Sequence, residues 1–303
     1  MSKIVSFSLI LIILQIISTS QLNIKSFDIF TPNHIPFIEG HRGVNKEFPE
    51  NTLRSFKSAL DNGIDGIELD VWLSKDNVPV VVHGSLMGFL LFHYKMAFGF
   101  VRNYYLHELK KLEVRKGNDK MPTLEEVFQL CKGKLFINIE IKDGRCDKIF
   151  PIIIDLIKKY DMFEQISISS FNHKYAKYVQ EFNQNNDKKI EFGFLYGKKI
   201  IFDRFKYDME NTTLNMYYSD VTKERCDKAH KNGMAVIAWF RMNDNENDEI
   251  YKQLLDNGVD CIISNFPKQA KAYRDFYFSN YNKTNISDEY NNYTYYLNNK
   301  DEL

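Results

Sequence analysis

Basic and acidic side chains recur at the ends of apolar segments in the first half of the chain. His41 and Arg42 directly follow the apolar segment 36–40, and His83 ends the run "VPVVVH". The middle of a buried strand has little use for such side chains, because a buried charge without a partner costs free energy. The loops that follow strands are where folded proteins place catalytic and binding groups. We therefore interpret these residues as part of an active site.

Three carboxylates and a lysine stand in two pairs, each separated by one residue. Glu68 and Asp70 lie in "GIELDV", and Glu140 and Lys142 lie in "INIEIK". Because alternate residues of a strand point to the same face, both members of each pair face the same way. Carboxylates inside a barrel need a cation, and a hard divalent metal ion with oxygen ligands answers that need. Lys142 and Arg42 would in turn hold a phosphate group. Taken alone, each feature has a structural explanation, and only their combination favours a site.

The elements that would position these residues alternate along the chain. From residue 35 onward, short β-rich segments are followed by amphipathic segments, in about eight units over roughly 250 residues. Alternating strands and helices predict a parallel sheet. Eight such units predict an α/β fold, a single-domain (β/α)8 TIM barrel over residues 35–278. A doubly wound open sheet is the alternative.

Several local signals mark where the predicted helices begin. Either Asn51 or Thr52 would cap the helix that follows, and Thr123 with Glu126 forms the spacing of a capping box. Pro151 either interrupts a helix over 146–161 or marks its start.

An apolar and aromatic insertion follows the second strand region. Residues 84–106, "GSLMGFLLFHYKMAFGFVRNYYL", form a connection too long for an ordinary loop between strand and helix. The segment is either a buried helix packed on the barrel mouth or an exposed apolar surface that contacts a membrane or a lipid-like substrate.

Both ends of the chain have the composition of targeting signals. Residues 1–20 carry an early lysine, an apolar run and then small residues, which predicts a secretory signal peptide; an uncleaved membrane anchor is the alternative. Residues 279–303 are predicted to form a flexible tail. The last four residues, "KDEL" from Lys300 to Leu303, are the signal read by the retrieval receptor of the endoplasmic reticulum. The sequence therefore predicts a protein of the endoplasmic reticulum lumen.

Composition adds three expectations. Lys plus Arg equals Asp plus Glu, at 40 each, so nothing in the overall charge indicates nucleic-acid binding. The four cysteines allow three complete disulfide pairings in an oxidising compartment, although Cys261 in "VDCIIS" is better explained as a free core thiol. Four N-x-S/T sequons suit a lumenal glycoprotein, at Asn211, Asn282, Asn285 and Asn292.

The chain resembles the glycerophosphodiester phosphodiesterases. Residues 41–84, "HRGVNKEFPENTLRSFKSALDNGIDGIELDVWLSKDNVPVVVHG", carry that family's H-R-G, P-E-N-T, E-x-D and V-V-x-H patterns in order. The segments "PTLEEVF", "INIEIK" and "GVDCIISNFP" are also similar, so the resemblance covers about residues 36–272.

The resemblance implies a (β/α)8 barrel that cleaves glycerophosphodiesters to glycerol 3-phosphate and an alcohol. Glu68, Asp70 and Glu140 would bind a divalent metal ion, either Mg²⁺ or Ca²⁺. His41 and His83 would form the general acid/base pair. Substrate-binding residues would be Arg42, Lys142 and Asn51, of which Asn51 would touch the phosphate or cap its helix, and Glu50 would shape the site. In this family the attacking group is the neighbouring glycerol hydroxyl, and water then opens the cyclic phosphate.

The chain departs from the family pattern after the second histidine, where Gly84 stands in place of a frequent aspartate. Three alternatives to this activity therefore stay open. The first is a lysophospholipase D acting on lysophospholipids, which the apolar insertion favours. The second is an inactive barrel that binds a lipid head group, which the complete set of site residues argues against. A lyase that stops at the cyclic phosphate is a third, weaker possibility.

Overall fold

The computed structural model describes residues 35–84, 94, 98–114, 117–197 and 211–284. The signal segment, most of the apolar insertion, residues 198–210 and the terminal tail lie outside this description. Among the residues that it covers, no helix combines the length and the apolar character that crossing a membrane requires.

Within the described residues, eight parallel strands close into a barrel. The last strand pairs with the first, and the first pairs with the second, where Gly40 lies opposite Ile67. This closure confirms the (β/α)8 barrel and excludes an open sheet. The barrel strands are β1 (Phe37–His41), β2 (Gly66–Leu73), β4 (Phe136–Ile141), β5 (Ile166–Ser170), β6 (Glu191–Tyr196), β7 (Thr212–Tyr217), β8 (Ala235–Trp239) and β9 (Cys261–Ser264).

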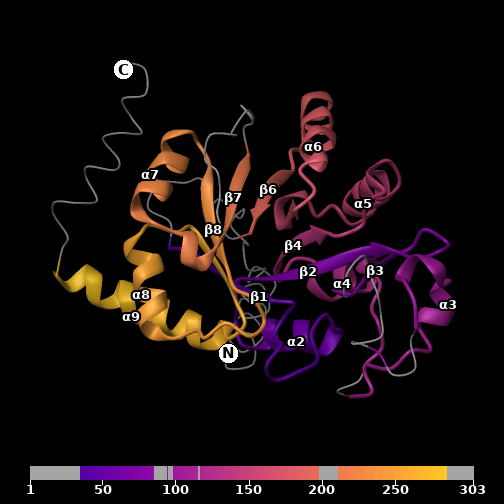
Figure 1. Cartoon of the computed structure of the whole chain (residues 1–303), viewed down its shortest axis with the longest axis horizontal. Coiled ribbons are helices and arrows are strands. Elements are labelled where there is room, and N and C mark those ends of the chain that lie inside the picture. The colour runs from indigo at the N-terminus through magenta and orange to yellow at the C-terminus, as the bar shows by residue number, and fades with distance from the viewer. Residues whose placement is uncertain (1–34, 85–93, 95–97, 115–116, 198–210, 285–303) are drawn as a thin grey trace, which may run out of the picture.

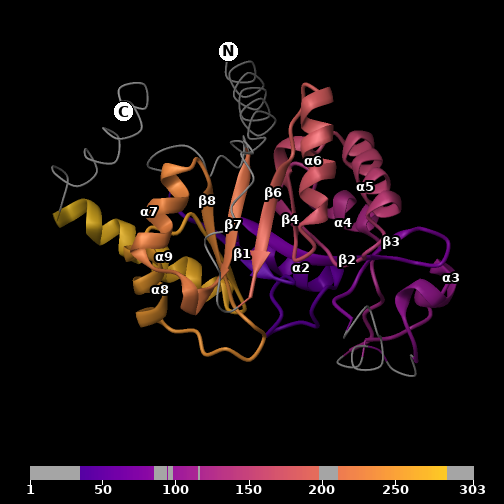
Figure 2. The ribbon, with the colours of Figure 1, turned by 45° about the horizontal axis from the view of Figure 1, so that its top comes forward.

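Helices surround this ring of strands on its outside (Figures 1 and 2). They alternate with the strands along the chain, and their apolar sides form one continuous core with the strands. The main helices are α2 (Leu53–Asp61), α4 (Leu124–Cys131), α5 (Cys146–Tyr160), α6 (Lys174–Asn185), α7 (Lys223–Lys231), α8 (Asp248–Asp256) and α9 (Pro267–Thr284).

The helix boundaries confirm some of the local signals and correct others. Thr52 rather than Asn51 caps α2, since its hydroxyl accepts a hydrogen bond from the Ser55 amide. Thr123 and Glu126 form the predicted capping box of α4. Pro151 lies inside α5, so it neither starts nor interrupts that helix. Burial of the isoleucine-rich face of α5 offsets the one backbone hydrogen bond that proline cannot make. At the other end of the chain, α9 continues to Thr284, beyond the predicted start of the tail.

The interior of the barrel contains polar as well as apolar side chains. The Ser169 hydroxyl donates to Asn138 Oδ1 at 2.8 Å, and Asn138 Nδ2 donates to Glu39 Oε2 at 3.1 Å. Glu39 is fully buried, and burial raises its pKa to about 8 against the opposing effect of its hydrogen bonds to Asn138 and Cys261. A protonated carboxyl group therefore lies inside the barrel at neutral pH.

The connection from β2 to β4 contains an extra structural unit beside the barrel. Strand β3 (Pro79–Val81) turns back and pairs antiparallel with the outer half of β2, and helix α3 (Leu106–Leu109) lies beyond it. In both ribbon views this unit projects away from the ring of strands (Figures 1 and 2). It has a small core of its own, to which Trp72, Tyr94 and Val101 contribute.

This arrangement answers part of the question about the apolar insertion. Tyr94 and Val101 are buried in the small core, so that part of the insertion is structural, whereas Phe98 is 75% exposed. The rest of the predicted apolar rim lies outside the described residues. The four cysteines are all buried and free, which agrees with the expectation for Cys261 and leaves no disulfide among them.

Candidate active site

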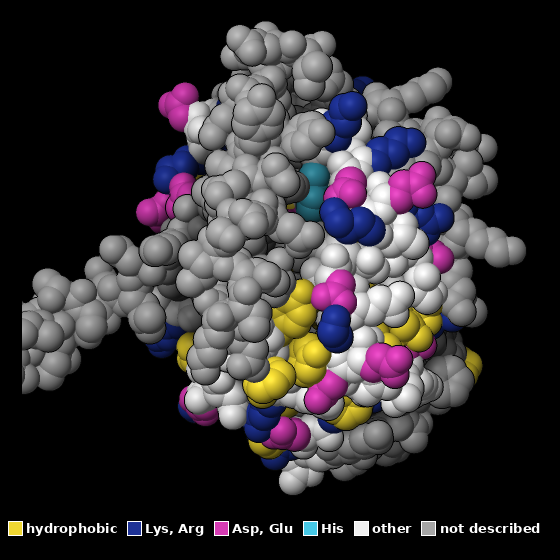
Figure 3. Space-filling view, turned by 90° about the vertical axis from the view of Figure 1, so that its left-hand side faces the viewer, with side chains coloured by type: hydrophobic (Ala, Val, Ile, Leu, Met, Phe, Trp, Pro, Cys, Tyr) yellow, Lys and Arg dark blue, Asp and Glu magenta, His cyan; other side chains and the backbone are white. Residues whose placement is uncertain are grey.

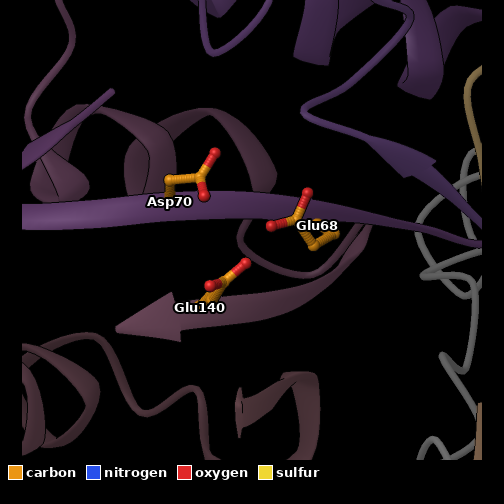
Figure 4. A group of neighbouring side chains, drawn as sticks. All are labelled: Glu68, Asp70 and Glu140. Atoms are coloured by element: carbon orange, nitrogen blue, oxygen red, sulfur yellow. The ribbon is translucent and has the colours of Figure 1, made fainter. Parts of the chain in front are cut away.

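The three predicted carboxylates meet at the carboxyl end of the barrel. Glu68 and Asp70 come from β2, and Glu140 comes from the neighbouring β4, where it lies directly opposite Asp70. Figure 4 shows the three carboxyl groups turned toward a common space. One oxygen of each lies within 4.8 Å of the others. The spacing of one residue between Glu68 and Asp70 produces this convergence, because both then point to the inner face.

Burial, together with the charges of neighbouring groups, controls the ionisation of this cluster. Burial, together with the charges of Asp70 and Glu140, raises the pKa of Glu68 well above its ordinary value. Burial likewise raises the pKa of Glu140, although Lys142 opposes this. Burial acts on Asp70 in the same sense, but Arg42, His83, Lys142 and the hydrogen bond from Asn51 together outweigh it and keep the pKa of Asp70 below its ordinary value. A bound divalent ion would favour the charged forms of Glu68 and Glu140 and would so oppose these upward shifts.

The donor set fits a hard divalent cation. Glu68 Oε1 and Asp70 Oδ1 are buried and make no hydrogen bond, which leaves two carboxylate oxygens available to a metal ion. Oxygen-only donors of this kind suit Mg²⁺ or Ca²⁺.

Two cations border the carboxylates. Lys142 Nζ lies 2.8 Å from Glu140 Oε1 and 3.5 Å from Asp70 Oδ1. Arg42 Nη1 donates to Glu50 Oε1 at 3.0 Å, and its Nε lies 3.1 Å from Asp70 Oδ2. These contacts raise the pKa of both side chains despite their burial, so both stay charged.

A tight turn after β1 brings Arg42 to the carboxylates. Arg42 has a left-handed backbone with φ of 55°, and its amide donates to Glu68 Oε2 at 3.0 Å. Gly43 follows with φ of 81°, and a Cβ at this position would lie 2.4 Å from Ser55 Oγ. Glycine is therefore required for the turn to pack against α2. The motif His-Arg-Gly thus supplies an imidazole and a guanidinium, together with the glycine that lets the turn pack against α2.

His41 is held in one tautomer by Asn265. The Asn265 amide nitrogen donates to Arg241 O at 2.8 Å and to Glu246 Oε1 at 2.7 Å, so its oxygen must face His41. His41 Nδ1 lies 2.9 Å from that oxygen and therefore carries the proton. The lone pair is then on Nε2, which lies 3.9 Å from Glu68 Oε2. Burial, helped by the Arg42 charge, lowers the pKa of His41 to about 3, so its ring is neutral.

His83 reaches the site from the antiparallel strand rather than from a barrel strand. The eight-residue β2 extends beyond its neighbours, and β3 runs back along it until Val82 N donates to Asp70 O at 3.0 Å. This return brings His83 to the barrel mouth, where burial lowers its pKa to about 4. Gly84, the departure from the family pattern, has φ of 61°, a conformation that favours glycine.

Asn51 makes a different contact from the predicted one. It is 1% exposed, and its amide nitrogen donates to Asp70 Oδ2 at 2.9 Å while its oxygen accepts from the Asp70 amide. Asn51 therefore orients a carboxylate and is not among the residues that line the cavity.

A cavity of about 580 Å³ opens above these groups. Six of the eight predicted site residues line it, and Asp70 lies buried beneath them. The sequence analysis missed Asn265, although it directly follows β9 and could have been found by the rule that identified His41. It also missed the other residues that line the cavity, which are Ser169, Phe171, Leu195, Trp239, Arg241, Met242, Asn243, Asp244 and Ile263.

Comparison with known proteins agrees with this geometry. Residues 41–269 match the model of the glycerophosphoryl diester phosphodiesterase family. The chain belongs to this family. It is 34% identical over 240 residues to a glycerophosphodiester phosphodiesterase of Caldanaerobacter subterraneus, and the match covers 75% of this chain and 93% of that protein. The chain is thus an enzyme, a phosphodiesterase of this family.

Solved structures of glycerophosphodiester phosphodiesterase relatives share the barrel. A provisionally named member from Galdieria sulphuraria is 30% identical with a TM-score of 0.72, covering 80% of this chain and 98% of that one. An Oleispira antarctica phosphodiesterase, solved in complex with its product sn-glycerol-3-phosphate, is 22% identical with a TM-score of 0.67, covering 80% and 97%. The latter similarity concerns the fold.

Proposed function

We propose that this protein hydrolyses glycerophosphodiesters to glycerol 3-phosphate and an alcohol, with a divalent metal ion bound by Glu68, Asp70 and Glu140. The observation that carries the proposal is the convergence of these carboxylates with two neutral imidazoles and two cations on one cavity. The product named for the Oleispira antarctica relative supports the choice of substrate. Deacylated phospholipids are compounds of this class, which connects the proposal to lipid metabolism.

In this proposal each group of residues has a separate role in catalysis. Arg42 and Lys142 hold phosphate oxygens and offset the charge that develops on them. A bound metal ion supplies further Lewis-acid stabilisation of that charge. One imidazole accepts the proton of the attacking glycerol hydroxyl, for which the lone pair of His41 Nε2 is suitably placed, and the other donates to the departing alkoxide. Asn265 and Asn51 orient His41 and Asp70. Water then opens the cyclic phosphate with the two imidazoles in exchanged roles.

A lysophospholipid substrate and contact with a lipid surface through residues 84–106 belong to the same proposal as secondary possibilities. The exposed Phe98 supports them, and the burial of Tyr94 and Val101 in the small core counts against a fully exposed rim. We further propose that the enzyme acts in the lumen of the endoplasmic reticulum and is returned there through its KDEL end, on the strength of the two terminal segments.

A substrate panel tests the activity and the metal together. Glycerophosphocholine, glycerophosphoinositol and lysophosphatidylcholine would each be incubated with Mg²⁺, with Ca²⁺ and with excess chelator, and glycerol 3-phosphate would be measured. We expect release from at least one glycerophosphodiester, loss in chelator and recovery when the metal is restored. Glu140→Gln should abolish turnover with the fold intact, whereas Glu249→Gln on the exposed surface should not. Full turnover in chelator would refute the metal, and a cyclic phosphate as the end product would indicate a lyase.

A further inference from the structure

A second wall of the cavity differs in chemistry from the carboxylates. It is formed by the segment after β8, which contributes Arg241 and Asp244, together with the rings of Phe171 and Trp239. The Phe171 and Trp239 rings meet edge to face, with their centroids 5.7 Å apart. The catalytic groups described above come from β1, β2, β3 and β4, so this wall contacts a different part of a bound substrate.

Asp244, the acidic residue of this wall, accepts two hydrogen bonds from within the protein. Asp244 Oδ1 accepts the Tyr217 hydroxyl at 2.9 Å, and Asp244 Oδ2 accepts the Arg241 amide at 2.6 Å. Asp244 therefore fixes the loop, and each of its carboxylate oxygens already accepts one hydrogen bond. A cationic ligand that approached it would have to compete with these two hydrogen bonds.

Arg241, the basic residue of this wall, stacks on an aromatic ring. The Arg241 guanidinium lies over the Tyr217 ring, 4.8 Å from its centroid, which holds the side chain in place. Among the described residues it has no ion-pair partner and no side-chain hydrogen bond. The other two cations that line the cavity, Arg42 and Lys142, are both paired with carboxylates. Arg241 thus presents a planar cation with five N–H donors to the cavity.

The aromatic rings of this wall do not favour a cationic ligand either. Lys142 Nζ already lies 5.8 Å from the centroid of the Phe171 ring. Arg241 itself occupies the face of Tyr217. A quaternary ammonium group that stacked on these rings would be placed near two protein cations, and like charges at that range repel.

We propose that Arg241 binds an anionic group on the leaving alcohol, so that the enzyme favours glycerophosphodiesters whose alcohol carries a carboxylate or a phosphate over those with a purely cationic head group. This inference rests on the proposed function and specifies its substrate class. Arginine recognises both anions through paired N–H donors, which gives the contact direction as well as charge.

Two substrates that differ by one carboxylate test the proposal. Glycerophosphoserine and glycerophosphoethanolamine share the glycerol phosphate and the ammonium group, so the ratio of their kcat/KM values isolates the carboxylate. We expect the metal-loaded wild type to favour glycerophosphoserine, and Arg241→Met to reduce the ratio about tenfold, the usual worth of one charge-assisted hydrogen bond. Arg241→Lys should keep part of the preference. Arg102→Met is the matched control, since Arg102 also stacks on a ring, 4.9 Å from Phe100, without lining the cavity.

Equal losses on both substrates in Arg241→Met would overturn the proposal, because Arg241 would then bind the shared glycerol or serve only the fold. A wild type that favours glycerophosphocholine and keeps this preference in Arg241→Met would also overturn it. Binding of the two compounds, measured by calorimetry in His41→Ala and in His41→Ala/Arg241→Met, gives the same ratio without turnover. If no substrate is hydrolysed at all, the proposed function fails, while the binding ratio still decides the role of Arg241.

Discussion

At the scale of single residues, the two imidazoles are the groups that transfer protons in the proposed mechanism. His41 and His83 both lie beside Arg42 and both have lowered pKa values, so each is neutral in the free enzyme, and the imidazole that donates to the departing alkoxide must first take up a proton. We expect His41→Ala and His83→Ala each to lower kcat by about 10²- to 10⁴-fold, the usual contribution of positioned proton transfer. Steady-state kinetics on a glycerophosphodiester, with thermal unfolding to verify the fold, would measure this. Near-normal turnover in either variant would remove that histidine from the mechanism.

Residue type and spacing placed most of the residues that line this site, and they failed where a contact depends on a local backbone conformation or on closure of the barrel. The pairs Glu68 with Asp70 and Glu140 with Lys142 could be placed because strand alternation fixes which side chains share a face. The role of Asn51 could not, since its contact with Asp70 depends on a left-handed backbone at Asn51 that no pattern announced. Asn265 lies 224 positions from His41, and only closure of the barrel brings them together.

At the scale of elements, the hairpin of β2 and β3 could not be predicted from the alternation of strands and helices. The run "VPVVVH" was correctly expected to be extended, but its antiparallel direction follows from the length of β2 beyond the barrel. Strand order, most helix positions and two caps could be predicted, because parallel strands and amphipathic helices have strong periodic signals. The helix of the predicted unit at 198–210 lies outside the described residues.

Strand β1 also carries a group whose ionisation opposes folding. Glu39 is protonated in the folded protein up to about pH 8 but loses its proton in the unfolded chain near its ordinary pKa of 4.5. Above that lower pKa the folded state binds more protons, so this group makes the free energy of unfolding fall as pH rises, by about 1.4 kcal/mol per pH unit until about pH 8.

Glu39→Gln should remove this dependence, since the glutamine oxygen can still accept the hydrogen bond from Asn138. Urea unfolding at pH 5 and pH 8 would measure it. We expect the variant to gain about 2–4 kcal/mol over the wild type between these two pH values, whereas Glu249→Gln, with an exposed side chain, should gain nothing. A variant that loses stability with pH as steeply as the wild type would show that Glu39 is ionised in the folded state.

At the scale of the whole molecule, charge is balanced on the surface as it is in the composition. Figure 3 shows basic and acidic side chains interspersed on the face that lies to the left in Figure 1. Pairs at i and i+4 along α7, α8 and α9, such as Lys223 with Asp227 and Lys252 with Asp256, produce this mixture. No broad basic surface appears among the described residues of this face, and the cations Arg42, Lys142 and Arg241 line the cavity.

The proposed location of the enzyme is tested on the whole molecule, because the proposal concerns both ends of the chain and the barrel between them. Asn211 is partly exposed at the start of β7, at the end of the barrel opposite the cavity, so a glycan there would leave the cavity open. If residues 1–20 direct the chain into the lumen, deletion of Lys300 to Leu303 should release active, glycosylated enzyme into the medium, since the retrieval receptor would no longer bind it. Immunoblots of cells and medium, before and after removal of N-linked glycans, would measure this. A full-length control that is retained inside the cell should show the same glycan-dependent shift. Unglycosylated protein in the cytosol, with or without the last four residues, would refute both terminal signals at once.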